Sequence, residues 1–308
     1  MAAMAAYDVS RYGQVTTAGF DATGAYVVTG STDTVVRIWA EEGFQLLREL
    51  RAHRCPVSAV AWARGRFSTM IASGASDGQV VAWRELRPGE WVVAHTLHVT
   101  GAVADLAWSP PEYGLCLAIA GTDDLGVLTL LTRRELQGGG EQWHVESFAA
   151  HPGGAQAVSW APSTSPVTLA TGPAVSRAVT TAGKRFVTCG HDGSACVWRC
   201  ENDKWFEQQA LSGDKQGTGK VRDVAWRPNI GVPASLIALC TEDGTVATWV
   251  QDAEGLQWRL QATWNAGGDA RRLAWSRTGT LLAVSVGANE RKLYKEVPGG
   301  NWECVSDA

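Results

Sequence analysis

Tryptophan recurs at regular places in this chain, and its spacing constrains the fold more than any other feature. The sequence holds 15 tryptophans in 308 residues, most of them in a unit that repeats about every forty to fifty residues. One class of aromatic residue ends a short apolar run: Phe20, Trp62, Trp108, Trp160, Trp226 and Trp275. A second class follows a turn aspartate by six positions: Asp33 and Trp39, Asp77 and Trp83, Asp192 and Trp198, Asp243 and Trp249. A third class begins another short run after a polar turn: Trp91, Trp143, Trp205, Trp258 and Trp302. Each unit therefore predicts four strands, the blade of a β-propeller.

The residues between the aromatic positions are typical of buried strands joined by tight hairpins. The turns SDG, HDG and EDG stand between β-branched and aromatic runs, where a hairpin needs a positive φ or an aspartate-capped turn. The runs that begin at Met70 and Leu236 are small and apolar on both faces, as strands between stacked sheets should be. No stretch keeps a 3.6-residue period. The predicted fold class is all-β, a WD-repeat β-propeller.

Six units follow an N-terminal segment of residues 1–13, with no linker or change of composition between them. Their approximate bounds are 14–50, 51–100, 101–149, 150–211, 212–266 and 267–306. We therefore expect residues 14–308 to form a single six-bladed domain. The first 13 residues lack the regions of a secretory signal, and no apolar run approaches the ~18 residues of a membrane span. The chain is predicted to be neither secreted by that route nor membrane-spanning.

The number of blades bears directly on function. WD-type blades usually pack seven to a ring, and the sixth unit already has its own four strands, so six blades could leave the ring open. An open apolar face of several hundred Å² is not tolerated by a soluble monomer, so an open ring would need a partner to cover it. On spacing alone, a closed six-bladed ring and a seventh blade in a degenerate stretch remain alternatives.

The aspartates and tryptophans of the units predict a structural hydrogen-bond network. A buried indole N–H needs an acceptor, and a buried aspartate in the turn can supply it directly or through a histidine and a hydroxyl. The second unit holds all the parts: His53, Ser73, Asp77 and Trp83. The same role is expected for the pairs Asp33 and Trp39, Asp192 and Trp198, and Asp243 and Trp249.

Signals for catalysis, cofactors, metals and nucleic acid are weak, and none of these is expected. The seven cysteines form no CxxC pair, which fits a reducing compartment. His95 and His98 are three apart on a strand and point to opposite faces, which disfavours a metal site. The loop 212–220 lacks the P-loop spacing, and GGG at 138–140 is typical of a hairpin tip. A net charge of −4 without a basic stripe gives nucleic-acid binding little support.

Several segments resemble the Sec-thirteen family of WD-repeat proteins, which serve the COPII vesicle coat and the Y-shaped complex of the nuclear pore. They are SPPEYGLCLAIAG (109–121), LLT (130–132), AVSWAP (157–162), VRDVAWRPNIGVPASLIALCTEDG (221–244) and LLAVSVGANERKLYKEVPGGNWECVSD (281–307). The inserts 163–183 and 228–233 fit as well. The resemblance implies a six-bladed open propeller, completed by a blade from an α-solenoid subunit of the coat or the pore through β-augmentation. It implies a scaffold in the cytoplasm, peripherally at the ER membrane and at the nuclear envelope, without homo-oligomers.

The sequence also departs from the family pattern. The fifth unit has no histidine in the loop 212–220, so its network is expected to be incomplete. The third unit has TDDLG at 122–126 and no terminal tryptophan, while the sixth has Tyr294 instead of tryptophan and lacks the aspartate at 288–289. We expect the sixth blade to be the least rigid. Partner contacts are expected from early strands of the first blade and apolar strands of the last: Val15, Thr17, Phe20, Leu281, Ala283, Val284 and Leu293.

Two other function classes remain open. A different WD-repeat adaptor, such as a Seh-one-like nucleoporin or a subunit of a ubiquitin ligase or chromatin complex, would use the top face of a closed ring. A propeller enzyme would need polar residues converging on the central channel, and no such cluster is visible. The first alternative predicts a well-behaved monomer, whereas an open scaffold predicts co-purification with a solenoid partner.

Overall fold

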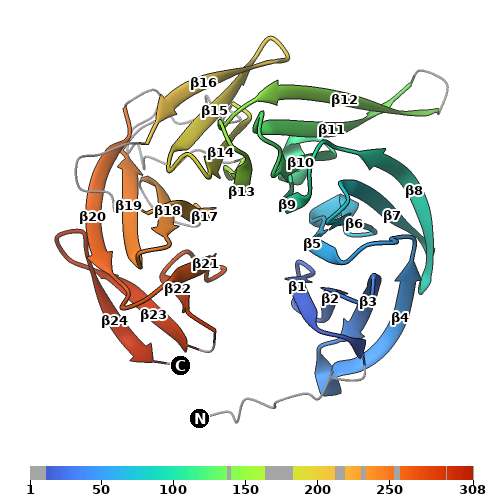
Figure 1. The fold of residues 1–308 in the computed structure, drawn as a ribbon, viewed down its shortest axis with the longest axis horizontal. Coiled ribbons are helices and arrows are strands. Elements are labelled where there is room, and N and C mark those ends of the chain that lie inside the picture. Colours follow the sequence, from blue (N-terminus) through green and yellow to red (C-terminus); the bar gives the residue numbers. More distant parts are fainter. Residues whose placement is uncertain are drawn as a thin grey trace, which may run out of the picture. The chain divides into compact units, whose positions relative to one another are not determined.

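The strands of this protein form six sheets of one kind. The computed structural model describes residues 12–136, 140–163, 183–211, 219–229, 234–252, 257–288 and 290–307. These residues form 24 strands and a few 3-10 segments of three residues, with no α-helix in the described ranges. Each sheet has four strands that follow one another in chain order (Figure 1). The predicted fold class, an all-β WD-repeat propeller with six blades, is confirmed.

Several sequence features lie wholly or partly outside the described residues. They are the N-terminal segment 1–13, the insert 163–183, the loop 212–220, the insert 228–233, the glycine run 138–140 and the turn 288–289.

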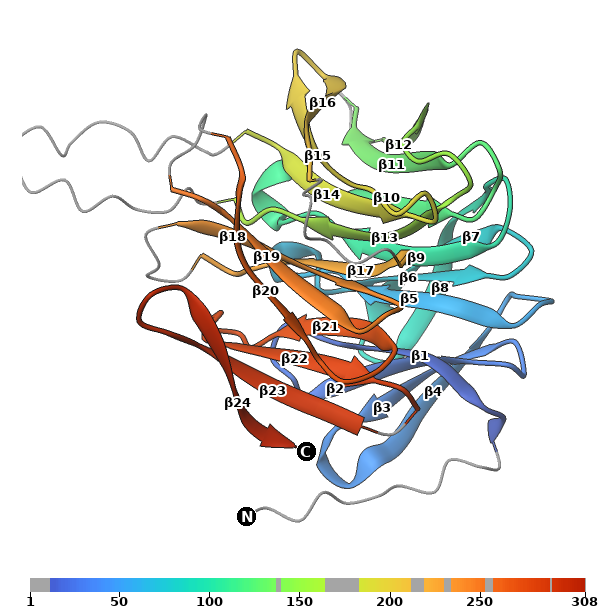
Figure 2. The same cartoon turned by 60° about the vertical axis from the view of Figure 1, so that its left-hand side comes forward.

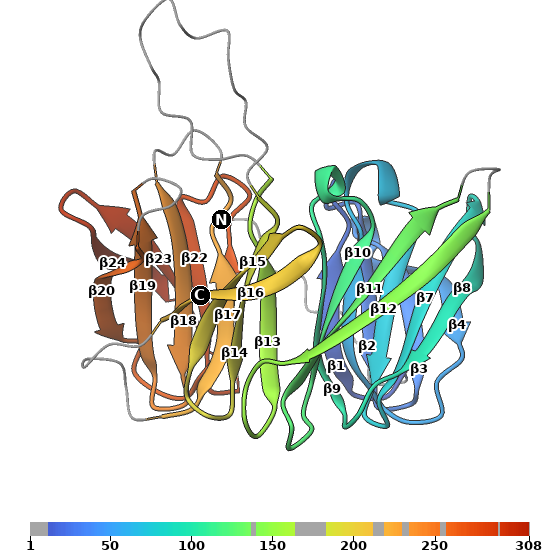
Figure 3. The ribbon, with the colours of Figure 1, turned by 90° about the horizontal axis from the view of Figure 1, so that it is seen from above.

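The chain divides into two compact units of three blades each. The first contains residues 1–123 and 127–148, and the second contains 124–126 and 149–308. The strands of the first unit are β1 (Val15–Phe20), β2 (Tyr26–Ser31), β3 (Val35–Ala40), β4 (Gln45–Arg51), β5 (Val57–Trp62), β6 (Met70–Ala75), β7 (Gln79–Arg87), β8 (Glu90–His98), β9 (Val103–Trp108), β10 (Cys116–Gly121), β11 (Val127–Glu135) and β12 (Glu141–Ala149). Figure 3 shows β9 to β12 in this order across blade three.

The second unit repeats the same pattern. Its strands are β13 (Ala155–Trp160), β14 (Arg185–Gly190), β15 (Ala195–Glu201), β16 (Lys204–Ala210), β17 (Val221–Trp226), β18 (Ser235–Thr241), β19 (Thr245–Gln251), β20 (Arg259–Asn265), β21 (Ala270–Trp275), β22 (Leu281–Val286), β23 (Glu290–Val297) and β24 (Asn301–Asp307). Figure 2 shows the meander of β21 to β24.

Blades within a unit pack face to face through their apolar middle strands. In the first unit, Val28 and Ile38 of blade one join Val60, Ile71 and Trp83 of blade two in one buried cluster. This arrangement explains the small apolar runs of the sequence, because the middle strands are covered on both sides.

Two glycines show how closely neighbouring blades approach. A Cβ on Gly30 would lie 2.4 Å from a methyl of Val57, and a Cβ on Gly74 would lie 2.4 Å from a methyl of Val103. Each valine belongs to the first strand of the next blade, so a residue larger than glycine at position 30 or 74 would push two sheets apart.

Blade one differs from the other WD-type blades in its β2–β3 turn. Gly78, Gly193 and Gly244 follow the turn aspartates of blades two, four and five with positive φ, whereas blade one has Thr34 there, with a φ of 72°. A β-branched residue is disfavoured in this left-handed region, so the turn of blade one holds local backbone strain.

Candidate partner-binding faces and supporting networks

Three blades share one rule for the indole N–H of the third-strand tryptophan. The indole nitrogens of Trp39, Trp83 and Trp198 each donate a hydrogen bond to a hydroxyl oxygen ten residues earlier in the chain. The distance from nitrogen to oxygen is 2.8 Å in all three blades. The acceptors lie on the second strand of the same blade: Thr29, Ser73 and Thr188. The three indoles are buried, so the hydroxyl satisfies a donor that water cannot reach.

In blade two the network continues to a buried histidine but not to a buried aspartate. His53 Nε2 lies 2.7 Å from Ser73 Oγ, and burial lowers the pKa of His53, against the opposing effects of Gln79 and of the Asp77 charge. Asp77 itself is exposed, and its Oδ1 accepts from the backbone N–H of Gln79 at 3.1 Å. The expectation of a buried aspartate is therefore corrected here.

The turn aspartates of the other WD-type blades are not buried in the core either. Asp192 and Asp243 are exposed, and Asp33 is half-buried. The physical reason is local, because each carboxylate caps its own turn by accepting the N–H two residues on, and this bond needs no burial: Val35 N, Ser194 N and Thr245 N donate to Asp33, Asp192 and Asp243.

Blade four holds the most complete network, through a histidine that the sequence analysis missed. His151 is fully buried, and its Nε2 lies 2.8 Å from Thr188 Oγ1. Its Nδ1 lies 2.9 Å from Ser194 Oγ and 3.4 Å from Asp192 Oδ1. A proton on Nδ1 faces the carboxylate, so Nε2 accepts from the Thr188 hydroxyl, which in turn accepts from Trp198. Burial lowers the pKa of His151, although the Asp192 charge acts in the opposite direction.

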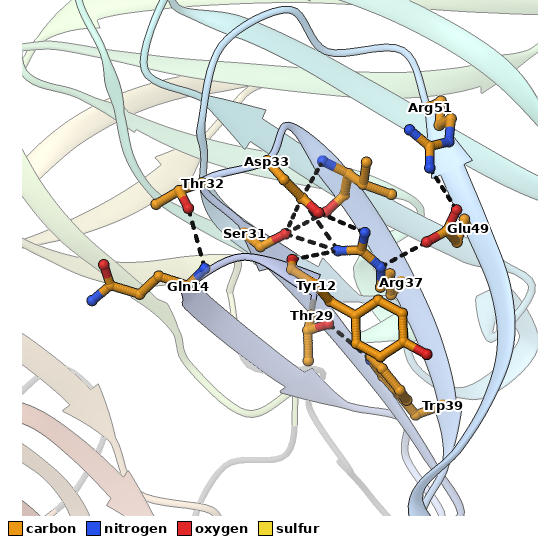
Figure 4. Close-up of polar contacts among 11 residues, drawn as sticks. Tyr12, Gln14, Thr29, Ser31, Thr32, Asp33, Arg37, Trp39, Glu49 and Arg51 are labelled. Carbon is orange, nitrogen blue, oxygen red and sulfur yellow. Dashed lines mark hydrogen bonds and ion pairs between the residues drawn. The ribbon is translucent and has the colours of Figure 1, made fainter. Parts of the chain in front are cut away.

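In blade one the turn aspartate pairs with a buried arginine, and the cluster around it is shown in Figure 4. Arg37 is buried, and its Nη2 lies 2.6 Å from Asp33 Oδ2 while its Nε lies 2.9 Å from Glu49 Oε1. Its Nη1 donates to Ser31 Oγ and to the backbone oxygen of Tyr12, each at 3.0 Å. Burial raises the pKa of Asp33, but the hydrogen bonds from Arg37 and Ser31 outweigh it, and the pKa lies below its ordinary value.

This arginine cluster also fixes the residue that precedes β1. The Tyr12 ring lies 4.8 Å under the Arg37 guanidinium and meets the edge of Trp39 at 5.2 Å, while Phe44 stacks on Trp39 at 5.1 Å. Two rings from outside the sheet therefore cover the indole of blade one.

Blade five keeps the tryptophan but lacks the hydroxyl. The residue ten positions before Trp249 is Leu239, which is fully buried. Trp249 Nε1 is consequently buried with no acceptor in the described part of the chain. The expected link between Asp243 and Trp249 is corrected, because Asp243 Oδ1 accepts from Thr241 Oγ1 and from its own turn.

Blades three and six have neither partner of the bond. In blade three, Leu131 stands at the position of the indole, paired with Leu117, and Ile119 stands at the position of the hydroxyl. In blade six, Tyr294 stands at the position of the indole, paired with Leu282, and Val284 stands at the position of the hydroxyl. The two changes occur together in these blades, so no buried indole is left without an acceptor there.

The expected contact residues of blade one lie on a poorly covered strand. Val15 and Thr17 are half-buried, and Phe20 is 61% exposed. No residue of β1 is buried, whereas the first strand of every other blade has at least two buried residues.

The expected contact residues of blade six fall on two opposite faces. Leu281, Ala283 and Leu293 are half-buried on one face. Val284 points the other way, is fully buried, and packs with Ala238 and other residues of blade five. The expectation for Val284 is corrected, because alternation along β22 places it in the core between blades five and six.

No group of three or more metal-binding side chains lies among the described residues. Burial raises the pKa of the Cys196 thiol to about 12, so it is protonated and unreactive at neutral pH. Within the described ranges, no helix has both the length and the apolar character needed to cross a membrane.

Comparison with known proteins agrees with this architecture. The family model "WD domain, G-beta repeat" matches residues 8–40 and 44–84. The solved structure titled "Structure of U3-55K" has a TM-score of 0.65 and 21% identity, and covers 89% of this chain and 74% of its own, which shows the fold alone. The blades and their indole networks thus define a WD-repeat protein.

Two curated relatives narrow the class further. "Protein SEC13 homolog" of Drosophila melanogaster is 34% identical over 291 residues, or 92% of this chain and 78% of the relative. "Protein transport protein sec13" of Emericella nidulans is 35% identical over 306 residues, or 94% of this chain and 93% of the relative. The chain belongs to the SEC13 family.

Proposed function

We propose that this chain is a non-catalytic scaffold in protein transport, and that a partner protein completes it by donating a seventh blade. Support for transport comes from the relatives named as protein transport proteins. Support for the donated blade comes from one observation on the last blade, the uneven burial of β22.

The second strand of a WD blade is normally covered on both faces. β6, β10, β14 and β18 are buried along their whole length. In β22, burial alternates, with every second residue only half-buried. A strand with the composition of β22 is expected between two stacked sheets, so its half-buried face is a candidate surface for packing against a partner sheet.

One row of residues on the half-buried face of β22 is apolar across three strands. Ala283 pairs with Ala274 of β21 and with Leu293 of β23. None of these three side chains is buried. A partner sheet that stacks on this row would bury three apolar side chains. The low burial of β1 adds a second surface of the same kind, on blade one.

The identity of the partner and the location of the complex are proposed from the resemblance to the Sec-thirteen family. The donated blade belongs to an α-solenoid subunit, either of the COPII coat that carries cargo from the ER to the Golgi or of the nuclear pore Y-complex. Main-chain pairing and apolar stacking hold the two chains together, as in other cases of β-augmentation. The complex acts in the cytoplasm, peripherally at the ER membrane and at the nuclear envelope, and this chain contributes rigidity rather than chemistry.

Native co-purification tests the proposal. The full chain is isolated from its source cell under mild salt, and proteins retained at equal stoichiometry are identified by mass spectrometry. The expected result is a large solenoid protein with a short β-rich segment, which Ala283→Arg loses. Val93→Arg is the control, because Val93 lies exposed on the outer strand of blade two. Recovery of a folded monomer, or equal retention by both variants, would overturn the donated blade and favour a self-sufficient WD-repeat adaptor.

A further inference from the structure

A cavity in the first unit gathers three arginines that the proposed function does not use. It has a volume of about 610 Å³ and lies where blades two and three meet. Arg66 comes from the 3-10 segment Gly65–Phe67, Arg84 from β7 and Arg133 from β11. Guanidinium groups from three separate elements therefore line one hollow.

The carboxylates nearby do not balance these charges. Arg84 and Arg133 both pair with Glu141, the second at 3.1 Å. Arg133 also reaches Glu135 at 3.4 Å, but the Glu135 side chain is 80% exposed. Within the described ranges no carboxylate pairs with Arg66. Three cations thus face two anions, one of them loosely held, in a chain whose net charge is −4.

Apolar side chains in the lining pack beside the arginines. The Arg66 guanidinium lies 4.9 Å from the Phe67 ring centre, and the Arg133 guanidinium lies 5.6 Å from it. Met70 and Leu115 line the same cavity and are nearly fully buried. Arginines that stack on an aromatic ring lose less freedom when they bind a carboxylate in their fork geometry.

We propose that this cavity binds an acidic segment of a partner protein, with a carboxylate on Arg66 and Arg133 and an adjacent apolar side chain against Phe67. The incoming carboxylate takes the place of Glu135, which swings into solvent. The volume lies within the range of ligand sites and accommodates a few side chains.

A peptide fits these observations better than a lipid surface does. A flat anionic membrane would also meet the exposed carboxylate of Glu135 at the cavity, whereas a single extended segment can enter the hollow and contact the apolar side chains. No residue of this site belongs to β1 or to blade six, so the site is independent of blade donation.

Methionine offers a direct reporter of binding. The chain has three methionines, Met1, Met4 and Met70, and Met70 lines the cavity. In the full chain labelled with ¹³C at the methionine methyls, a peptide of alternating glutamate and leucine is expected to shift the Met70 signal saturably. The other two signals should stay in place, and a lysine–leucine peptide should shift none.

A matched pair of variants tests the arginine. Arg66→Glu is expected to weaken binding of the acidic peptide about tenfold or more at low ionic strength, because it removes a charge-assisted pair and adds a repulsion. Arg64→Glu makes the same charge change on an exposed residue outside the lining and should have little effect. Equal loss in both variants would show only non-specific attraction and would overturn the site.

Two further probes separate the possible ligands. Inorganic phosphate that shifts Met70 while the peptide does not would reduce the cavity to a simple anion site and overturn the peptide assignment. Vesicles containing phosphatidylserine that bind in an Arg66-dependent way, without peptide binding, would overturn it in favour of a membrane contact.

Discussion

The network of blade four can be tested by removing a single oxygen. Thr188 is fully buried, and its hydroxyl contacts Trp198 Nε1 and His151 Nε2, both at 2.8 Å. Thr188→Val keeps the shape and burial of the side chain, but it leaves the indole N–H and the imidazole nitrogen without the hydroxyl. Backbone pairing of β14 with β13 and β15 is not affected by the change.

The expected cost follows from the number of groups left unpaired. Each buried polar group without a partner costs about 1–3 kcal/mol, and the added methyl returns a little under about 1 kcal/mol. The variant should therefore be less stable by about 1–5 kcal/mol. For a cooperative unit of about 150 residues, this corresponds to a fall in melting temperature of about 2–20 °C.

Blade five supplies a matched control for this experiment. Thr248 is also fully buried, but its Oγ1 has no hydrogen-bond partner among the described residues. Thr248→Val makes the same replacement where no bond is lost, so it should be neutral or slightly stabilising. Thermal unfolding of both variants, followed by circular dichroism, measures the difference. A Thr188→Val protein that melts no lower than the Thr248→Val protein would refute the network in blade four.

Three further outcomes follow from the same structure. Trp249→Phe should cost about 1–3 kcal/mol less than Trp198→Phe in chemical denaturation, because only Trp198 loses an indole hydrogen bond; equal costs would contradict the acceptor assignment. Thr34→Gly should stabilise the protein by about 0.5–1 kcal/mol, since relief of about 1–2 kcal/mol at a positive φ exceeds the entropy cost of glycine, and a lower melting temperature would argue against strain in that turn. Burial lowers the pKa of His53 and of His151 from 6.5, so the unfolded chain takes up protons first. Their contribution to stability is complete above pH 6.5 and is lost as the pH falls through the lowered values; a melting temperature that stays level or rises between about pH 7 and pH 5 would contradict this.

The fold could be predicted from the sequence because its signals are local and repeated. A tryptophan six residues after a turn aspartate marks the end of a hairpin of fixed length, and this geometry does not depend on the rest of the chain. Strand positions followed directly: the apolar run that begins at Met70 forms β6, which starts at the same residue.

The indole acceptor was predicted in one blade and could have been predicted in two more. Ser73 was named in blade two, whereas only the turn aspartate and the tryptophan were named in blades one and four. The hydroxyl stands ten positions before the tryptophan in all three blades. This spacing results from the register of the second and third strands, so the sequence alone shows a hydroxyl at Thr29 and Thr188 and none at Leu239.

Two members of the networks were hidden for different reasons. His53 precedes Asp77 closely, whereas the insert 163–183 separates His151 from Asp192, so no common spacing revealed it. In blade one the partner of the turn aspartate is Arg37, which is not a histidine and lies on β3. Its role depends on Glu49 and on the backbone of Tyr12, which only folding brings to it.

The sequence by itself determined the number of blades, their four-stranded form and the family, because repeat length, turn chemistry and alternation act within a few residues of each other. The tertiary structure decided which of the two faces of a strand is covered, and this cannot be read from a run of small apolar residues. It placed Val284 in a core and Ala283 on a half-covered face, and it brought three arginines from separate elements around one cavity. These outcomes depend on how blades pack against each other, which is a property of the folded chain.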